Sequence, residues 1–556
     1  MITASAATIS GPLNQVNQGG WMSAVMLKAS TQSGKALISL ARRRRIVGNG
    51  TEYHRPDVRL RARRIRDAAP RCSCFGPGDR RRGPRMVLIA RTRAVPTLSS
   101  PPMKCIFPNF LKLLLPALAA LVVAPASAQT AAMAPAPESA PRWFKGNLHT
   151  HSLWSDGDDY PEMIADWYKK NGYNFLALSD HNVLQEGQRW LELKQPVSVG
   201  GQVQQRGAGP VLARYVERFG SSWVEQREKD GKRSVRLKPL AEYRALLEEP
   251  GRFLMIPSEE ITSTWKKPKT ATMPERSGPV HINVTNPRDF LAPVESSDAV
   301  EIMQRTVDAV LAQREKTGQP MFTHINHPNF RWGLTAEELM QVKGERFFEV
   351  YNGHPGVENE GDATRASMDK MWDIILTHRI AQLGLDPMFG IGVDDSHHYQ
   401  TIGLGKSNSG RGWVMVRARH LTPESIIHAM EAGDFYASSG VTLADLAREP
   451  NKLSVRIQGE RGVTYVTQFI GTRRGFDPHS EVMEGPANSR TLPHRRYSKD
   501  IGAVLAEVRG TEASYTLKGD ELYVRAKIIS SKPKVNGSVA NEFETAWVQP
   551  VIGSAK

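Results

Sequence analysis

Two histidines and an aspartate near residue 150 have the residue types and spacing of metal ligands. His149 and His151 stand two positions apart in the apolar run that begins at Phe144, and Asp156 follows in the next turn. Residues two apart on a β-strand point the same way, so the two imidazoles can bind one ion if this run is a strand. Imidazole is a common ligand for zinc-like metals, and a carboxylate complements it. Alone, the pair fits an ordinary strand equally well, so its meaning depends on further ligands.

Residues of the same types accompany most of the later apolar runs. These runs are 174–179, Phe253–Pro257, Val280–Thr285, Met321–Asn326, Phe347–Tyr351 and Phe389–Asp394. The ligand-type residues that go with them are His181, Glu259, Glu260, His281, His324, His327, Asp394, Asp395 and His397. Counting the opening run, six of seven predicted strands carry such residues. The sequence therefore predicts one constellation of ligands.

Helical patterns separate several of these predicted strands. One helix is expected to begin at Pro161 and to end at Gly172, and others precede Gly318 and His378. Alternating strands and helices imply a parallel sheet, which we expect to close as a barrel. Sites in such barrels lie at the carboxyl ends of the strands, which is where the ligand-type residues fall.

The charge of the chain is concentrated at its beginning. The whole sequence has 73 Lys and Arg against 57 Asp and Glu, a formal charge of +16. Residues 1–102 hold 19 of the basic and 4 of the acidic residues, which leaves 54 and 53 for the rest. Because the remainder is nearly neutral, its charge gives no reason to expect a nucleic-acid partner.

Residues 103–128 have the pattern of a signal peptide. A basic start at Met103 leads into the apolar core 113–124, and Ala126-Ser-Ala128 is a typical cleavage site. That core is shorter than the roughly 20 residues of a membrane span. We expect export to the periplasm or the medium, no span in the mature chain, and residues 1–102 to be a spurious or disordered basic extension. Cys72, Cys74 and Cys105 all precede the cleavage site, so thiolate ligands and disulfides are not expected after it.

At this point the ordered motifs resemble the polymerase and histidinol phosphatase (PHP) superfamily of metallohydrolases. The matching segments are Asn147–His151, Ser179–His181, Pro257–Thr262, His281, Asn326–Pro328 and Asp395–His397. The resemblance covers roughly residues 144–440. It implies a distorted (β/α)7 TIM-like barrel that binds two or three divalent ions, commonly Zn, Mn or Fe.

The resemblance also implies which residues bind each ion. One ion would take His149, His151, Glu260 and Asp395, and a second would take Glu260, His281 and His327, with Glu260 bridging. A third would take Asp156, His181 and His397, although the family often has histidine where Asp156 stands. Glu259 and Asp394 are expected to face away, and His324, His354 and His398 to be neighbours of the site or surface residues.

Clustered ions bridged by a carboxylate can hold a hydroxide at neutral pH, and we expect that hydroxide to be the nucleophile. The resemblance favours a phosphoesterase that acts on a small-molecule ester. Arg331, Lys406 and Arg411 are candidates for binding the substrate anion. One alternative is hydrolysis of a carboxylic or carbamate ester, since the motifs also resemble an exported, carbaryl-hydrolase-like group. A second is an exported metal-binding module without turnover. The oligomeric state is open.

The remaining segments complete the predicted organisation. Residues 129–143, rich in Ala and Pro, are expected to form a linker, and 144–445 the barrel. Within it, residues 185–250 are an insertion that ends in a helix near Leu240–Leu247 and acts as a lid or as a solvated decoration. Residues 446–556 alternate apolar and polar side chains in runs such as Lys452–Gln458, which predicts a small antiparallel β appendage.

Overall fold

The computed structural model describes residues 27–32, 35–40, 140–193, 197–199, 202–204, 207–270, 275–483 and 491–554. The chain divides into two compact units, Met1–Ala124 and Pro125–Lys556. In the first unit the described residues form one antiparallel hairpin, β1 (Leu27–Gln32) with β2 (Lys35–Leu40). The predicted signal peptide, and most of the predicted basic extension and linker, lie outside the described residues.

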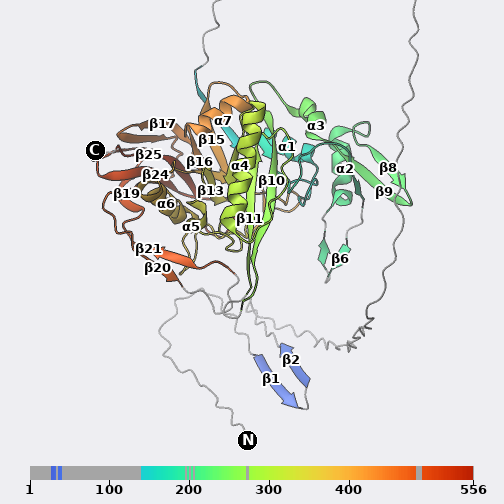
Figure 1. Ribbon diagram of the computed structural model, residues 1–556. Helices are drawn as coiled ribbons and strands as arrows, with labels where there is room; N and C mark the ends of the chain where they lie inside the picture. Colours follow the sequence, from blue (N-terminus) through green and yellow to red (C-terminus); the bar gives the residue numbers. More distant parts are fainter. Residues whose placement is uncertain are drawn as a thin grey trace, which may run out of the picture. The chain divides into compact units, whose positions relative to one another are not determined.

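The second unit is built on a mixed sheet of 13 strands (Figure 1). In order of neighbours these are β14 (Phe389–Val393), β13 (Phe347–Asn352), β12 (Phe322–Ile325), β11 (Arg276–Thr285), β10 (Leu254–Lys267), β4 (Phe175–Leu178), β3 (Arg142–Asn147), β15 (Trp413–Ala418), β16 (Phe435–Ser438), β25 (Phe543–Ile552), β24 (Glu521–Pro533), β19 (Tyr465–Arg473) and β22 (Ala503–Arg509). The chain is thus a mixed α/β protein, and the strands predicted around the ligand residues all belong to this sheet.

The strands that carry the ligand residues do not all run in one direction. β3, β4 and β10 pair in parallel, as do β12, β13 and β14. β11 is antiparallel to both of its neighbours, β10 and β12. Only residues 268–275 separate β10 from β11, which is too short for the crossover of about a dozen residues that a parallel pair requires.

The reversal of β11 corrects the predicted place of His281. His281 does not lie at the carboxyl end of a strand but in the middle of β11, opposite Thr262. It reaches the same edge as the other ligands because its strand runs the other way. A closed (β/α)7 barrel is also not shown: β14 packs against β15, but among the described strands no hydrogen-bonded ladder joins them.

The sheet curves around an apolar interior that lies at the beginnings of the strands. Side chains from β3, β4, β10, β12, β13, β14, β15 and β16 share one buried cluster, in which the rings of Phe322, Phe347, Phe389 and Phe435 contact one another. Aromatic and β-branched residues suit this position because they fill space between pleated strands. The polar ends of the same strands therefore project together on the other side of this core.

Helices lie along the outer faces of the sheet. α1 (Pro161–Lys170) packs on β4, α4 (Ala299–Thr317) on β10, β11 and β12, α6 (Met368–His378) on β13, and α7 (Pro423–Glu431) on β15. The short α5 (Ala336–Leu339) contacts α4 and α6, and the turn η1 (Arg379–Leu383) continues α6. The helices predicted to begin at Pro161 and to precede Gly318 and His378 are confirmed.

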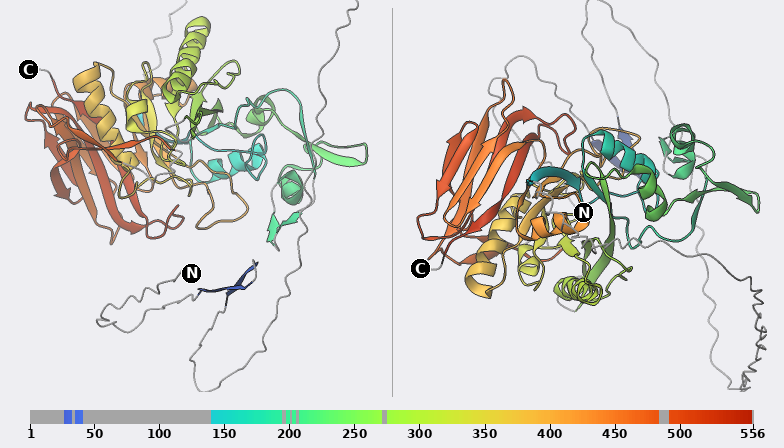
Figure 2. Two further views of the ribbon diagram at one scale, coloured as in Figure 1. Left: turned by 60° about the horizontal axis from the view of Figure 1, so that its bottom comes forward. Right: turned by 90° about the horizontal axis from the view of Figure 1, so that it is seen from above.

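The insertion and the C-terminal strands lie on opposite sides of this unit (Figures 1 and 2). The insertion holds α2 (Ala208–Phe219), a sheet of β5 (Arg189–Glu192), β9 (Lys232–Leu237) and β8 (Gln226–Lys229), the pair β6 (Val197–Val199) and β7 (Gln202–Gln204), and the predicted helix, α3 (Leu240–Leu247). Among the described residues, no helix has both the length and the apolar content that a membrane crossing requires.

The strands beyond residue 446 are antiparallel, as predicted, and several of them extend the main sheet. β16 pairs with β25, and β24, β19 and β22 follow in order. Two smaller sheets lie alongside, one of β17 (Leu443–Glu449), β18 (Lys452–Ile457) and β23 (Glu512–Thr516), the other of β20 (Ser480–Met483) and β21 (His494–Tyr497). These strands therefore join the ligand-bearing strands in one hydrogen-bonded sheet.

Candidate metal centre

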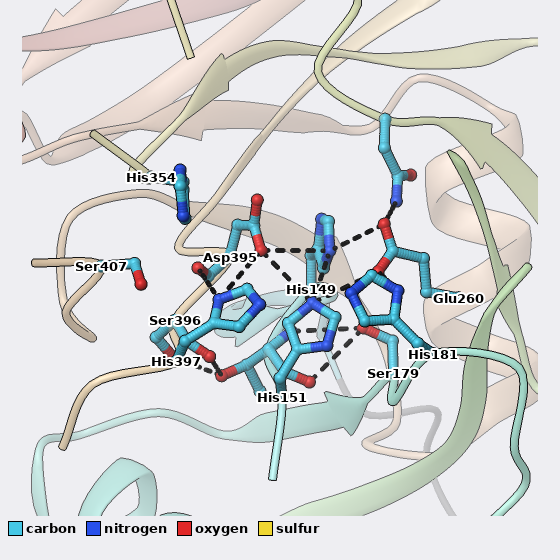
Figure 3. A network of polar contacts seen from close by, with 12 residues as sticks. His149, His151, Ser179, His181, Glu260, His354, Asp395, Ser396, His397 and Ser407 are labelled. Carbon is cyan, nitrogen blue, oxygen red and sulfur yellow. Dashed lines mark hydrogen bonds and ion pairs between the residues drawn. The ribbon is translucent and has the colours of Figure 1, made fainter. Parts of the chain in front are cut away.

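The structure brings all nine predicted ligand residues to one edge of the main sheet. Figure 3 shows six of them, His149, His151, His181, Glu260, Asp395 and His397. The nine residues come from seven places in the chain: the end of β3, the loop after it, the end of β4, β10, β11, and the loops after β12 and β14. The residues are His149, His151, Asp156, His181, Glu260, His281, His327, Asp395 and His397. Their ligand atoms form overlapping groups, and within each group the atoms lie within 4.8 Å of one another.

The first group surrounds the His149 and His151 pair. The Nε2 atoms of these two rings are 3.1 Å apart. Glu260 Oε1 is 3.4 Å from His149 Nε2, and Asp395 Oδ1 is 3.3 Å from His151 Nε2. Because metal–nitrogen bonds are about 2.0–2.1 Å long, two ligands of one ion lie roughly 3–3.4 Å apart. The four side chains that the resemblance assigns to one ion thus have the spacing of ligands to a common centre.

Glu260 lies between this group and a second one. Its Oε1 is 3.0 Å from His281 Nδ1 and 3.6 Å from His327 Nε2, and its Oε2 is 2.7 Å from His181 Nδ1. The carboxylate is fully buried. A carboxylate with imidazole nitrogens around both oxygens has the arrangement that a bridging ligand needs.

The third group lies at the solvent side of the cluster. Asp156 Oδ1 is 3.4 Å from His397 Nε2 and 3.6 Å from His151 Nδ1, while Asp156 Oδ2 is 3.7 Å from His181 Nε2. The side chain of Asp156 is 52% exposed, in contrast to the buried Glu260 and Asp395. His151 therefore faces two groups, one with each ring nitrogen.

The donor set fits divalent metal ions on chemical grounds. Glu260 Oε2, Asp395 Oδ1 and His281 Nδ1 are buried and make no hydrogen bond of proper geometry, although their neighbours are close. Buried polar atoms are normally hydrogen-bonded, and buried carboxylates are paired or bind metals. Nitrogen and oxygen ligands of this mixture suit Zn, Mn or Fe. Ions bound within the groups to which these residues belong would satisfy the three atoms.

Electrostatics keeps the carboxylates in their ligand form. Burial alone would raise the pKa of Glu260, but the charge of His181 and His149 outweighs burial and holds that pKa well below its ordinary value. In the same way, burial raises and His149 lowers the pKa of Asp395, with the net pKa well below its ordinary value. The lowered pKa values favour the ionised form of both groups, which is the form that binds metal.

Glu259 and Asp394, the acidic residues next to two of the ligands, face away from the cluster and accept hydrogen bonds from loop amides. Glu259 accepts a hydrogen bond from the amide of Leu291 at 2.8 Å. Asp394 accepts from the amides of Gly410, Arg411 and Gly412 and from a tyrosine hydroxyl. Strand alternation explains this for Glu259 and Glu260 on β10, whereas Asp394 and Asp395 lie in the loop after β14.

Asp395 has the left-handed backbone conformation, with φ of 49°. This conformation is costly for residues other than glycine and persists only where the surroundings enforce it. Here the amide of Asp395 donates to the carbonyl of His149 at 2.9 Å, while Asp394 is fixed by the loop amides. The strained residue is thereby oriented toward the histidine pair.

A further residue of the site, Glu349, was not predicted from the sequence. It lies on β13 and is fully buried. Its Oε1 is 2.6 Å from His149 Nδ1, and its Oε2 accepts from the amide of His327 at 2.7 Å and from Asn352 Nδ2 at 2.8 Å. A carboxylate on Nδ1 fixes the imidazole so that Nε2 is free for a metal. A lone acidic residue inside the apolar run Phe347–Tyr351 was the available signal.

Two asparagines orient the central carboxylates. Asn326 Nδ2 donates to Glu260 Oε1 at 2.8 Å, and Asn352 Nδ2 donates to Asp395 Oδ2 at 3.1 Å. Both asparagines are buried. These bonds leave Glu260 Oε2 and Asp395 Oδ1 directed at the histidines.

The three cations predicted to bind substrate lie in different settings. Arg411 is fully buried, and its guanidinium donates to the carbonyls of Gly353, Lys406 and Asn536 among others, so it holds loops together. Lys406 lies on the loop that follows His397. Arg331 is exposed and stacks on Phe330, whose ring lies 5.1 Å from that of His327.

The three histidines expected beside the site are placed differently from one another. His324 is buried behind His149, with Nε2 3.5 Å from Glu349 Oε1. His354 is partly exposed, and its ring lies 5.5 Å from that of His397. His398 bonds to Ser407 Oγ at 3.0 Å through Nδ1. In the described part of the chain, His324 is the only one of these three that joins a group of potential ligands, together with His149 and Glu349.

Comparison with known proteins adds little to this geometry. Neither a protein-family model nor a curated protein matches the chain. One solved structure that it resembles is a two-domain protein of Bacteroides vulgatus, described as containing a predicted PHP-like metal-dependent phosphoesterase. The sequences are 14% identical, the match covers 74% of this chain and 95% of the other, and the TM-score is 0.29. A likeness of this size does not establish a common fold or function.

Proposed function

We propose that this chain is a metal-dependent hydrolase that acts on ester bonds, with phosphoric esters as the favoured class. The observation that carries the proposal is the overlap of three ligand groups at one strand edge, with Glu260 between two of them. Ions bound so close together act on the same reacting group. We also propose a distant relationship to the PHP superfamily, which is supported by the order of the ligand motifs along the chain.

The groups of the chain would hold two or three divalent ions of the Zn, Mn or Fe type. His149, His151, Glu260 and Asp395 would bind one, Glu260, His281 and His327 a second, and Asp156, His181 and His397 a third. Divalent ions in such a site lower the pKa of water and stabilise the charge that develops on the oxygens of the ester.

The protein's own contribution is to fix these ligands before substrate arrives. Glu349 holds His149 in one tautomer, and the asparagine amides aim Glu260 and Asp395. Among the three carboxylates of the cluster, Asp156 is the exposed one, so the cluster is open to solvent on its side. Substrate therefore approaches from that side, and preorganised ligands strengthen electrostatic stabilisation in the transition state.

The test is turnover by protein reconstituted with Zn, Mn or Fe, set beside metal-free protein. We expect hydrolysis of p-nitrophenyl phosphate or bis-p-nitrophenyl phosphate that requires metal and falls on chelation. If the protein hydrolyses only a naphthyl carbamate or p-nitrophenyl acetate, the substrate class is a carboxylic or carbamate ester and not a phosphoric ester. Bound metal without turnover of any of these would contradict the proposed enzyme activity and favour a metal-binding module.

We further propose that residues 103–128 direct export, on the strength of their charge and apolar pattern. Amino-terminal sequencing of the protein from its natural source should then begin near Gln129. A mature protein that retains Met103 would contradict this.

A further inference from the structure

The turn after β12 has an unusual backbone next to the metal ligands. Arg331 and Trp332 are consecutive residues with positive φ, 50° and 55°. Neither is glycine, so each adopts a conformation that is sparsely populated and costs free energy. Residues held in this way cluster at binding sites, where the surroundings enforce one position of a side chain. The turn lies four residues beyond His327.

Contacts of Trp332 and Gly333 hold the turn in this conformation. Trp332 stacks under the guanidinium of Arg365 at 4.3 Å and meets the ring of His494 edge-on. The carbonyl of Gly333 accepts from Trp265 Nε1 at 2.9 Å. With Trp332 fixed on one side, the side chain of Arg331 is turned to the other, where it lies over Phe330 with Cζ 5.1 Å from the ring centroid.

Phe330 in turn packs against the ligands. Its ring centroid is 5.1 Å from that of His327, 6.2 Å from that of His281 and 5.7 Å from that of His354. Arg331 and His327 thus contact the same aromatic ring. The guanidinium has no ion pair with any residue that the structure describes, whereas that of Arg365 is paired with Asp362 at 3.0 Å. An unpaired, permanently charged group beside the cluster is available to an anion.

His354, which also contacts the ring of Phe330, presents a donor. Its Nδ1 accepts the amide hydrogen of Gly356 at 2.9 Å, so the ring proton is on Nε2. Across the described residues no protein group bonds to Nε2, and the side chain is partly exposed. In Figure 3 the ring stands beside Asp395, at the edge of the cluster.

We propose that Arg331 and His354, which both contact the ring of Phe330, form an anion subsite at the edge of the metal cluster. The subsite binds the non-bridging oxygens of a phosphoric ester, with the Arg331 guanidinium as a charged donor and His354 Nε2–H as a neutral one. This inference rests on the proposed function, because it takes the cluster to hold the divalent ions that act on the ester. Under this proposal, Arg331 and His354 select an anionic ester over a neutral one.

The test measures affinity for inorganic phosphate in the metal-loaded protein, by calorimetry and as inhibition of ester hydrolysis. We compare the wild type with Arg331→Gln, Arg331→Lys and His354→Leu. The matched control is Arg305→Gln, an exposed arginine on α4. Metal content and Tm are recorded for each variant, so that loss of the cluster or of the fold is seen directly.

Arg331→Gln should weaken phosphate binding about tenfold or more, since a charge-assisted bond is lost. The KM for the neutral p-nitrophenyl acetate and the metal content should not change. Lysine should restore part of the affinity, His354→Leu should give a smaller loss, and the control should behave as wild type. Unchanged phosphate affinity in Arg331→Gln, or no phosphate binding by metal-loaded wild type, would overturn the subsite. Wild type that binds no metal would overturn the proposed function as well, and metal analysis identifies that case.

Discussion

Glu349 orients His149 through a hydrogen bond and so determines how well this histidine can bind a metal ion. Its carboxylate bonds to His149 Nδ1, the amide of His327 and Asn352, so one side chain supports three parts of the cluster. Burial would raise the pKa of Glu349, but the charge of His149 and its hydrogen bond outweigh burial and bring the pKa to about 2. The residue is therefore a permanent anion that positions its neighbours without itself facing substrate.

Replacing Glu349 with Gln should weaken metal binding by about 10–100-fold, because the partner that fixes a ligating imidazole is lost. Competition with a chromophoric chelator measures the change. Glu345→Gln is the matched control, since Glu345 is also fully buried but bonds to Thr323 and to the amide of Phe347. Equal metal affinity in Glu349→Gln and wild type would show that the carboxylate does not support the cluster.

Asp156 should matter for one ion only. It contacts His397 and His181 and is half exposed, while the other carboxylates of the cluster are buried. We expect Asp156→Asn to lose one equivalent of metal and to keep the rest, as measured by elemental analysis after gel filtration. Asp362→Asn, on a loop where the carboxylate pairs with Arg365, serves as the control. Loss of all the metal in Asp156→Asn would mean that the three groups are not separate sites.

At the scale of elements, the insertion is held on the helix that follows the first ligands. Arg214 donates to Asp159 at 3.0 Å, Arg218 to Asp166 at 2.7 Å, and Tyr215 to Glu162 at 2.5 Å. α2 thus contacts one face of α1 and the turn before it. The amide of Asp158, in the same turn, donates to the carbonyl of His397. The insertion therefore supports the segment that carries Asp156.

This contact should make stability depend on pH through Glu162. Burial raises the pKa of Glu162 from 4.5 to about 7, so the folded state holds its proton more tightly than the unfolded state. The free energy of unfolding therefore falls as pH rises from 4.5 to 7, by up to about 3 kcal/mol for this group.

Glu162→Gln keeps an oxygen that accepts from Tyr215 and Trp223 but removes the titration. Urea unfolding at pH 5 and pH 8 should show a smaller difference between the two pH values in this variant than in wild type. The exposed Glu301→Gln should match wild type. A pH dependence in Glu162→Gln as large as that of wild type would contradict the assigned role.

At the scale of the whole molecule, the residues that meet at the cluster were predictable because each lies in or after a recognisable apolar run. Sequence could not reveal Glu349, since a single glutamate in a strand does not show which way it faces. Arg411 was predicted as a candidate for binding the substrate anion. In the structure its guanidinium donates instead to backbone carbonyls, those of Gly353 and Gly403. The short connection 268–275 indicates that β11 runs antiparallel to β10. The prediction counted the strands but did not consider the length of this connection. The C-terminal strands were predicted, but their continuity with the main sheet depends on pairing between distant segments.

Removing the ions should destabilise the second unit. The cluster packs buried carboxylates against histidines, and bound ions stabilise only the folded arrangement. With free metal at 100 times its Kd, the stabilisation is about 2.7 kcal/mol per site. Chelation should lower Tm in wild type and change it much less in Glu260→Gln. An unchanged Tm in wild type would contradict the coupling.

The central claim is that Glu260 bridges metal ions that the histidines share, and its neighbour supplies the sharpest comparison. Glu259 and Glu260 are adjacent and both fully buried, but only Glu260 faces the cluster, whereas Glu259 bonds to the amide of Leu291. The measurement is metal content of Glu260→Gln and Glu259→Gln after reconstitution. We predict two or three equivalents in wild type and in Glu259→Gln, and the loss of at least one in Glu260→Gln. Equal metal content in Glu260→Gln and wild type, or no bound metal in either, would contradict the claim.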